Sequence, residues 1–210
     1  MKTLAASVLV LILSFCSISL LTEDFQVFTK EQARRLSVSQ SKPLLPATLM
    51  LDQRGDLHDL RNWAIEEQKL LVVDFIYTRC NTVCLSLGSE FQQLQELIQA
   101  KNMQERVALL SITFDPLHDT PEKLADYASR LKANEQIWRF ATVKDISDLD
   151  GLLRFFMVTV INDEFGGYQH NAALLGVMPD GRLHSIADSG SGRHQEVLDV
   201  WLKASFPSGY

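Results

Sequence analysis

One stretch near the middle of this 210-residue chain limits its fold more than any other. Residues 72–77 are mostly β-branched or aromatic, which is typical of a buried strand. Apolar residues then recur at helical spacing: Leu87, Phe91, Leu94 and Ile98. Cys80 and Cys84 lie between the two patterns, where unpaired backbone N–H groups and the positive helix end favour thiolates. We expect both sulfurs on one face of the helix, able either to close a disulfide or to bind one ion.

The N-terminal segment has the composition of an export signal. Residues 4–21 carry no charged side chain and follow Lys2, a pattern typical of a secretory signal or of a minimal membrane span. No Ala-x-Ala site ends this run, and the run exceeds the usual signal core, so we favour an uncleaved anchor over cleavage. A lipoprotein signal at Cys16 is disfavoured because the preceding Phe15 is bulky. We predict a signal or anchor at 1–21, a linker at 22–44 and one domain at 45–210.

Polarity, cysteine count and net charge limit the functions that this chain can have. Residues 23–42 are polar and mixed in charge, which favours a tether, with a short surface helix as the alternative. Because Cys16 falls in the leader, the domain keeps only Cys80 and Cys84. A bridge across a three-residue gap adds little stability, so this pair indicates chemistry. The formal net charge of −6 makes nucleic acid an unsuitable partner.

The remaining patterns alternate between strands and helices. Such βαβ units predict parallel core strands with helices on both faces, and function at the carboxyl ends of the strands. We predict an α/β, thioredoxin-like fold: a central mixed sheet flanked by helices, with an N-terminal hairpin extension. The expected elements are a hairpin at 48–58 turning at Gly55, strands at 107–114 and 137–143, helices at 60–67, 120–131 and 146–156, a hairpin at 172–187 and a helix at 194–204.

A histidine is expected close to the cysteines. In this architecture the loop at 165–171 packs against the strand–helix junction and brings His170 towards Cys80 and Cys84. Two thiolates and an imidazole suit copper(I) and also hold copper(II), whereas zinc requires a fourth ligand. The alternatives are a purely structural bridge for the cysteines and a surface position for His170.

Three blocks together resemble the Sco/SenC family of copper-binding proteins. They are Tyr77-Thr78-x-Cys80-x3-Cys84, then Asp115-Pro116-x2-Asp119-Thr120-Pro121-Glu122, and His170 ahead of Pro179-Asp180-Gly181-Arg182. The resemblance implies a thioredoxin-like domain in the bacterial periplasm, tethered to the inner membrane, that delivers copper to the binuclear copper site of cytochrome c oxidase. It implies Cys80, Cys84 and His170 as metal ligands. The oxidase copper-site subunit would be the partner, with other copper chaperones or thioredoxin-like reductases as further partners.

Two features depart from that family pattern. The family places proline after each cysteine, whereas this chain has Asn81 and Leu85, which predicts a less rigid loop and a changed copper affinity or redox poise. His118 stands where we expect an arginine or a similar polar residue. Because His118 follows the carboxyl end of a core strand, one interpretation is that its side chain lies close to the metal. Solvent exposure is the favoured alternative.

The cysteine pair supports two functions of different classes. The first is a copper metallochaperone, which is not an enzyme. The second is a thiol–disulfide oxidoreductase that reduces oxidase-subunit cysteines before metallation, with Cys80 and Cys84 as its catalytic residues. His170 favours copper binding. A peroxide-consuming enzyme is disfavoured, because residues 78–80 match the peroxidatic motif only loosely.

Overall fold

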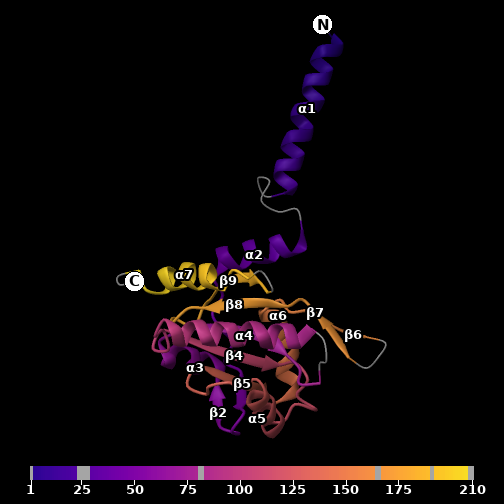
Figure 1. Ribbon diagram of the computed structural model, residues 1–210. Coiled ribbons are helices and arrows are strands. Elements are labelled where there is room, and N and C mark those ends of the chain that lie inside the picture. Colours follow the sequence, from indigo (N-terminus) through magenta and orange to yellow (C-terminus); the bar gives the residue numbers. More distant parts are fainter. Residues whose placement is uncertain (1, 23–28, 80–82, 164–166, 190–191, 208–210) are drawn as a thin grey trace. The chain divides into compact units, whose positions relative to one another are not determined.

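The computed structural model describes residues 2–22, 29–79, 83–163, 167–189 and 192–207 (Figure 1). The side chains of residues 2–6, 8, 18, 21 and 83–88 are not described. The chain divides into two compact units, residues 1–41 and 42–210.

The first unit contains two helices, α1 (Lys2–Leu21) and α2 (Lys30–Ser41). Helix α2 lies where we expected a tether, so the alternative of a short helix is correct. A capping box explains it: the backbone N–H of Gln32 donates to Thr29 Oγ1 at 3.1 Å, and the backbone N–H of Thr29 donates to Gln32 Oε1 at 3.0 Å. In the described ranges, no helix combines the length and apolar character needed to cross a membrane.

The second unit is built on one mixed sheet, as predicted. Within the described residues its strand order is β2-β1-β5-β4-β3-β8-β9. Strands β3, β4 and β5 are parallel, and the remaining neighbours pair antiparallel. The strands are β1 (Leu49–Asp52), β2 (Leu57–Asp59), β3 (Leu70–Ile76), β4 (Val107–Thr113), β5 (Trp138–Val143), β8 (Ala173–Val177) and β9 (Leu183–Asp188).

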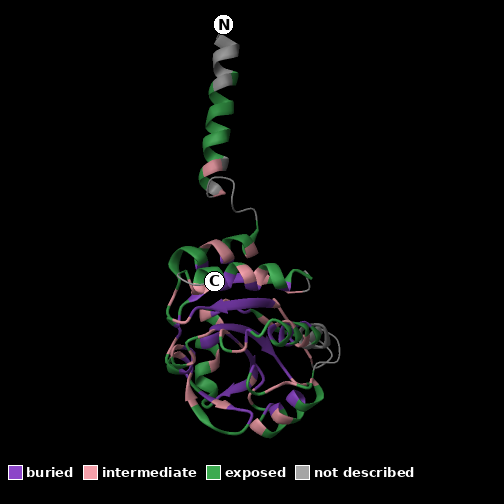
Figure 2. Ribbon diagram, turned by 60° about the vertical axis from the view of Figure 1, so that its left-hand side comes forward, coloured by how far each residue is buried: buried purple, intermediate pink, exposed green. Residues whose placement is uncertain are grey.

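Helices cover both faces of this sheet. On one face α4 (Val83–Ala100), α5 (Pro121–Arg130) and α7 (His194–Ser205) contribute to a single apolar core, and Figure 1 shows α4 in front of the strands. That core includes Phe91 of α4, Leu124 of α5 and Trp201 of α7. On the other face lie α3 (Leu60–Glu67), the 3₁₀ turn η1 (Ile146–Asp148) and α6 (Leu149–Phe155), with Phe156 at 5.2 Å from the Phe75 ring. The strands form the buried layer between them (Figure 2).

The turns follow the predicted chemistry. Gly55 turns the β1–β2 hairpin with φ of 83°, and Gly181 turns the β8–β9 hairpin with φ of 77°. Thr120 stands at the N-cap of α5 in extended conformation, directly before Pro121.

One hairpin was not predicted. Strand β7 (Tyr168–His170) lies in the loop expected at 165–171, and it pairs antiparallel with β6 (Val160–Asn162), for which no element was expected. These two strands form a sheet of their own. Three-residue strands are too short for alternation to appear in the sequence. This hairpin carries His170.

Candidate functional site

The site lies at the carboxyl ends of β3 and β4, as expected for parallel strands. Strand β3 ends at Ile76 and α4 begins at Val83, so the predicted strand-to-helix junction is confirmed. Cys80 lies outside the described residues, as does Asn81. Cys84 falls in the first turn of α4, and its side chain, like that of Leu85, is outside the described set. The predicted disulfide and the sulfur ligands therefore stay predictions.

A buried carboxylate connects the segment after β3 to the end of β4 through hydrogen bonds. Asp119 is 0% exposed and accepts hydrogen bonds from the Thr78 backbone N–H at 2.9 Å and from Thr78 Oγ1 at 2.6 Å. Thr113 Oγ1, at the end of β4, donates to the same carboxylate at 2.5 Å. These three donors compensate the burial of the charge. Asp119 thereby fixes the segment that leads, two residues later, to Cys80.

A second carboxylate holds a positive charge beside the cysteine motif. Asp115 is buried, and its Oδ2 accepts a hydrogen bond from Arg79 Nη2 at 2.7 Å. This hydrogen bond raises the pKa of Arg79. The Nδ1 of His118 lies 2.8 Å from the other Asp115 oxygen, and the His118 side chain is exposed, as its favoured alternative predicted. Arg79 directly precedes Cys80 in the sequence, so this ion pair lies next to the cysteine motif along the chain.

His170 has the properties of a metal ligand whose ring nitrogens are not engaged in hydrogen bonds within the described residues. It ends β7 half-buried, and within the described part of the chain neither Nδ1 nor Nε2 has a hydrogen-bond partner, although both are buried. Its ring packs against Phe114 at 5.1 Å between centroids. Burial lowers the pKa of His170, so the neutral imidazole that metal ligation requires is favoured. Buried polar groups are normally paired, so these two nitrogens call for an explanation.

Aromatic residues position the hairpin that carries His170. Tyr77, which follows β3, has its ring 5.2 Å from both Phe114 and Tyr168. The Tyr168 backbone N–H donates to Tyr77 Oη at 3.3 Å. Asn171 holds the other side, accepting from the Thr159 N–H at 2.7 Å. The structure thus brings the strand of His170 against a residue three positions before Cys80.

Sequence reasoning missed the residues that build this arrangement. Asp119 and Tyr77 belong to the family-like blocks, but their roles as a buried anchor and as a contact for β7 were not predicted. Among the side chains that the structure describes, no three His, Cys, Asp or Glu residues converge as a metal cluster. That set lacks both predicted sulfur ligands.

Comparison with known proteins identifies the family. The model of the SCO1/SenC family matches residues 50–200 of this chain. This chain belongs to the SCO1/SenC family. The match covers most of the chain and confirms the resemblance seen in the three sequence blocks.

A curated relative supports the assignment of this chain to the SCO1/SenC family. An SCO1 protein homolog of Bacillus subtilis (strain 168) is 26% identical over 129 residues, which are 60% of this chain and 66% of that relative. The chain thus spans slightly less than two thirds of the relative's length.

Solved structures confirm the thioredoxin-like fold of the Sco proteins. BsSco, described as a member of the Sco family of cytochrome c oxidase assembly proteins with a disulfide switch, matches with a TM-score of 0.69 and 22% identity, covering 79% of this chain and 95% of that one. ScoI of Bradyrhizobium japonicum, solved with copper bound, matches with a TM-score of 0.60 and 20% identity, covering 78% of this chain and 99% of that one.

Proposed function

We propose that this chain is a copper metallochaperone that binds one copper ion through Cys80, Cys84 and His170 and delivers it to the binuclear copper site of cytochrome c oxidase. The observation that carries the proposal is the His170 imidazole, whose two buried nitrogens lack hydrogen-bond partners within the described residues. Family membership supports the proposal, as does the copper bound to ScoI of Bradyrhizobium japonicum.

The donor set suits copper as a transferable cargo. Two thiolates favour copper(I), while the imidazole adds a nitrogen that copper(II) prefers. Copper would occupy the region between the β3–α4 junction and the β6–β7 hairpin. There Asp119 limits the movement of the segment that precedes Cys80.

The site is proposed to work outside the cytoplasm. The uncharged run at 4–21 supports export, with the domain in the bacterial periplasm and the N-terminal segment in the inner membrane. A cleaved secretory signal is the alternative. In both cases the domain meets the copper-site subunit of the oxidase, and other copper chaperones or thioredoxin-like reductases are further partners.

A thiol–disulfide oxidoreductase is the second candidate. The observation that favours it is the Cys80-x3-Cys84 pair itself, because the sulfurs that bind copper(I) also exchange disulfides. The disulfide switch described for BsSco points in the same direction. This function needs the two sulfurs and not His170.

The His170→Ala variant separates the two functions. It removes one of three ligands, so copper(I) binding should weaken and copper(II) binding should be lost most strongly. The measurement is a copper titration of the variant, together with restoration of cytochrome oxidase activity in cells that lack the protein. We expect both to fall.

A matched variant controls for burial. His184 on β9 is also half-buried and its pKa is also lowered by burial, but its Nδ1 already meets Ser185 Oγ at 2.7 Å. His184→Ala should leave copper binding unchanged. Full oxidase restoration by His170→Ala despite lost copper binding would contradict the chaperone function and favour the oxidoreductase.

A further inference from the structure

Tyr77 is a buried side chain with a hydroxyl, at the point where the main sheet meets the hairpin of His170. The residue directly follows β3 and is 6% exposed. Burying a hydroxyl costs free energy unless it forms hydrogen bonds, and a phenylalanine ring would fill the same space without that cost. The hydroxyl therefore calls for an explanation that the ring contacts of Tyr77 do not supply.

This hydroxyl meets the backbone of β7 at its outer edge. Tyr77 Oη accepts a hydrogen bond from the Tyr168 N–H at 3.3 Å, and the Tyr168 carbonyl oxygen lies 3.5 Å away as an acceptor. The Asp163 N–H donates to the Gly167 carbonyl at 2.9 Å, so the next pair, Asn162 and Tyr168, turns its backbone polar groups away from the partner strand. The hydroxyl thus occupies the place of a neighbouring strand.

The position of Tyr77 is itself fixed by the main sheet. Directly before it, the Ile76 carbonyl accepts a hydrogen bond from the Phe114 N–H at 3.0 Å. Directly after it, the Thr78 N–H donates to the buried Asp119 at 2.9 Å. The hydroxyl therefore projects from a residue that is held on both sides by the ends of β3 and β4.

Asn171, at the base of the hairpin, forms hydrogen bonds of a different kind. Asn171 Oδ1 accepts from the Thr159 N–H at 2.7 Å, and Asn171 Nδ2 donates to the Met157 carbonyl at 3.1 Å. Both partners belong to the segment that leads into β6, so these bonds close the hairpin on itself. The Tyr77 hydroxyl, in contrast, links the hairpin to the main sheet.

The link reaches His170 within two residues. Tyr168 lies two positions before His170 in β7, so their side chains share one face of the hairpin. The Phe114 ring packs against both of them, at 5.5 Å from the Tyr168 ring and 5.1 Å from the His170 ring. A shift of Tyr168 relative to Tyr77 therefore moves His170 across the Phe114 ring.

We propose that the Tyr77 hydroxyl is a positioning group that sets the place of His170 and thereby favours the binding of copper(II). The proposal rests on His170 being a copper ligand, as in the proposed function. A ligand that is already held in place loses less conformational freedom on binding. Copper(II) prefers nitrogen ligands, so it gains most from a held imidazole, whereas copper(I) depends chiefly on thiolates.

Tyr77→Phe tests the proposal, because it removes the hydroxyl and keeps the ring. In the copper-free full-length chain, the NMR contact between the rings of Phe114 and His170 should weaken. Copper(II) affinity should fall about threefold to tenfold, the range expected for one hydrogen bond, and the nitrogen signature in the copper(II) EPR spectrum should weaken. Copper(I) affinity should change by less than about twofold. A wild-type ring contact together with wild-type copper(II) affinity would overturn the proposal.

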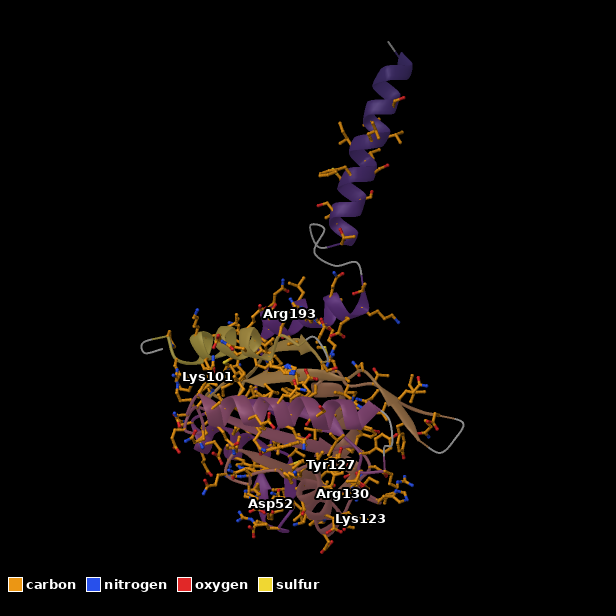
Figure 3. All side chains as sticks on the ribbon, viewed as in Figure 1. Asp52, Lys101, Lys123, Tyr127, Arg130 and Arg193 are labelled. Atoms are coloured by element: carbon orange, nitrogen blue, oxygen red, sulfur yellow. The ribbon has the colours of Figure 1, made fainter. Side chains whose placement is uncertain are left out.

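Tyr127→Phe is the matched control. Tyr127, labelled in Figure 3, is also 6% exposed and lies on α5, with its ring 5.9 Å from that of Phe140. This variant should keep the contact between Phe114 and His170 and both copper affinities. If Tyr77→Phe lowered only the free energy of unfolding, and neither the nitrogen signature nor the ratio of the two copper affinities changed, its role would be structural and the proposal would fail.

Gly167→Ala tests the same contact from the hairpin. A Cβ at Gly167 would lie 3.3 Å from Tyr77 Oη and 2.7 Å from Asp163 Oδ2, so the added methyl group displaces the hairpin or these side chains. Copper(II) affinity should fall, and it should fall less in a Tyr77→Phe background, where there is no hydroxyl to displace. An equal fall in both backgrounds would mean that the methyl group acts through Asp163, and would count against the hydroxyl.

The ring contact in the copper-free protein separates failure of this inference from failure of the proposed function. If the wild type binds no copper but Tyr77→Phe weakens the contact between Phe114 and His170, the positioning role stands and copper binding fails. If the wild type binds copper through His170 and Tyr77→Phe changes neither the contact nor the affinity, only the positioning role fails.

Discussion

At the scale of single residues, two buried carboxylates, Asp119 in the segment after β4 and Asp74 within β3, differ in their hydrogen bonding. Asp119 accepts three hydrogen bonds and joins the segments that follow β3 and β4. Asp74 lies within β3, four residues before Thr78, and is buried without such donors among the described residues. The first carboxylate is matched by hydrogen-bond donors, whereas burial raises the pKa of the second and favours its protonated form.

This difference predicts a pH dependence of stability. The pKa of Asp74 is raised from 3.8 to about 8 in the folded state, so between these values the unfolded chain has lost a proton that the folded chain keeps. The free energy of unfolding should therefore fall as pH rises through this window. Asp74→Asn should remove that slope and stabilise the protein at pH 7 by up to about 4 kcal/mol. Urea denaturation of the wild type and of Asp74→Asn at pH 4, 5, 6 and 7 measures the free energy of unfolding of each protein. Equal slopes in both proteins would show that Asp74 is not the titrating group.

At the scale of elements, long or strongly patterned segments could be predicted from the sequence. The apolar runs of β3, β4 and β5 and the helical spacing of α4 determine the parallel core, because burial dictates the side-chain period. The β6–β7 hairpin could not be predicted, since its position depends on the contact of Tyr168 with Tyr77, which is distant in sequence. Helix α2 was only the alternative to a tether, because its polar composition favours a tether; the Thr29–Gln32 capping box that begins the helix was not recognised in the sequence.

In the candidate site too, the sequence indicated residue types and not contacts between distant segments. Residue types and spacing singled out His170, and the structure places it beside Phe114 with unpartnered nitrogens within the described residues. The roles of Asp119 and Tyr77 depend on contacts between segments far apart in sequence, which spacing alone does not reveal.

Two turn glycines offer a matched prediction. Gly55 and Gly181 both have positive φ, but a Cβ at Gly55 meets nothing within 4 Å, whereas one at Gly181 meets Ile65 Cγ1 at 3.0 Å. Gly55→Ala should cost about 1–2 kcal/mol from the backbone alone, and Gly181→Ala about 2–4 kcal/mol because overpacking is added. Thermal or urea unfolding of the two variants compares them. Equal costs would mean that Ile65 yields freely to the added methyl group.

At the scale of the whole molecule, the proposed site lies at one end of a mixed sheet. The carboxyl ends of β3 and β4 supply the cysteine motif and its anchors, and a separate hairpin supplies His170. This division places the proposed ligands on two segments that are distant in sequence.

The N-terminal segment gives a prediction at this scale. With residues 1–21 as an anchor, the protein should fractionate with membranes, and removal of those residues should release a soluble folded domain. Fractionation of cells followed by N-terminal sequencing measures this. A soluble protein that begins near Thr22 would show that the segment is a cleaved signal.

The most direct test of the proposed site is X-ray absorption at the copper edge of the copper(I)-loaded, reduced protein, which counts the sulfur and nitrogen ligands. We expect two sulfur ligands and one nitrogen ligand in the wild type, with the nitrogen absent in His170→Ala and unchanged in His184→Ala. A wild-type site with sulfur ligands alone, or a nitrogen ligand that persists in His170→Ala, would contradict the proposed site.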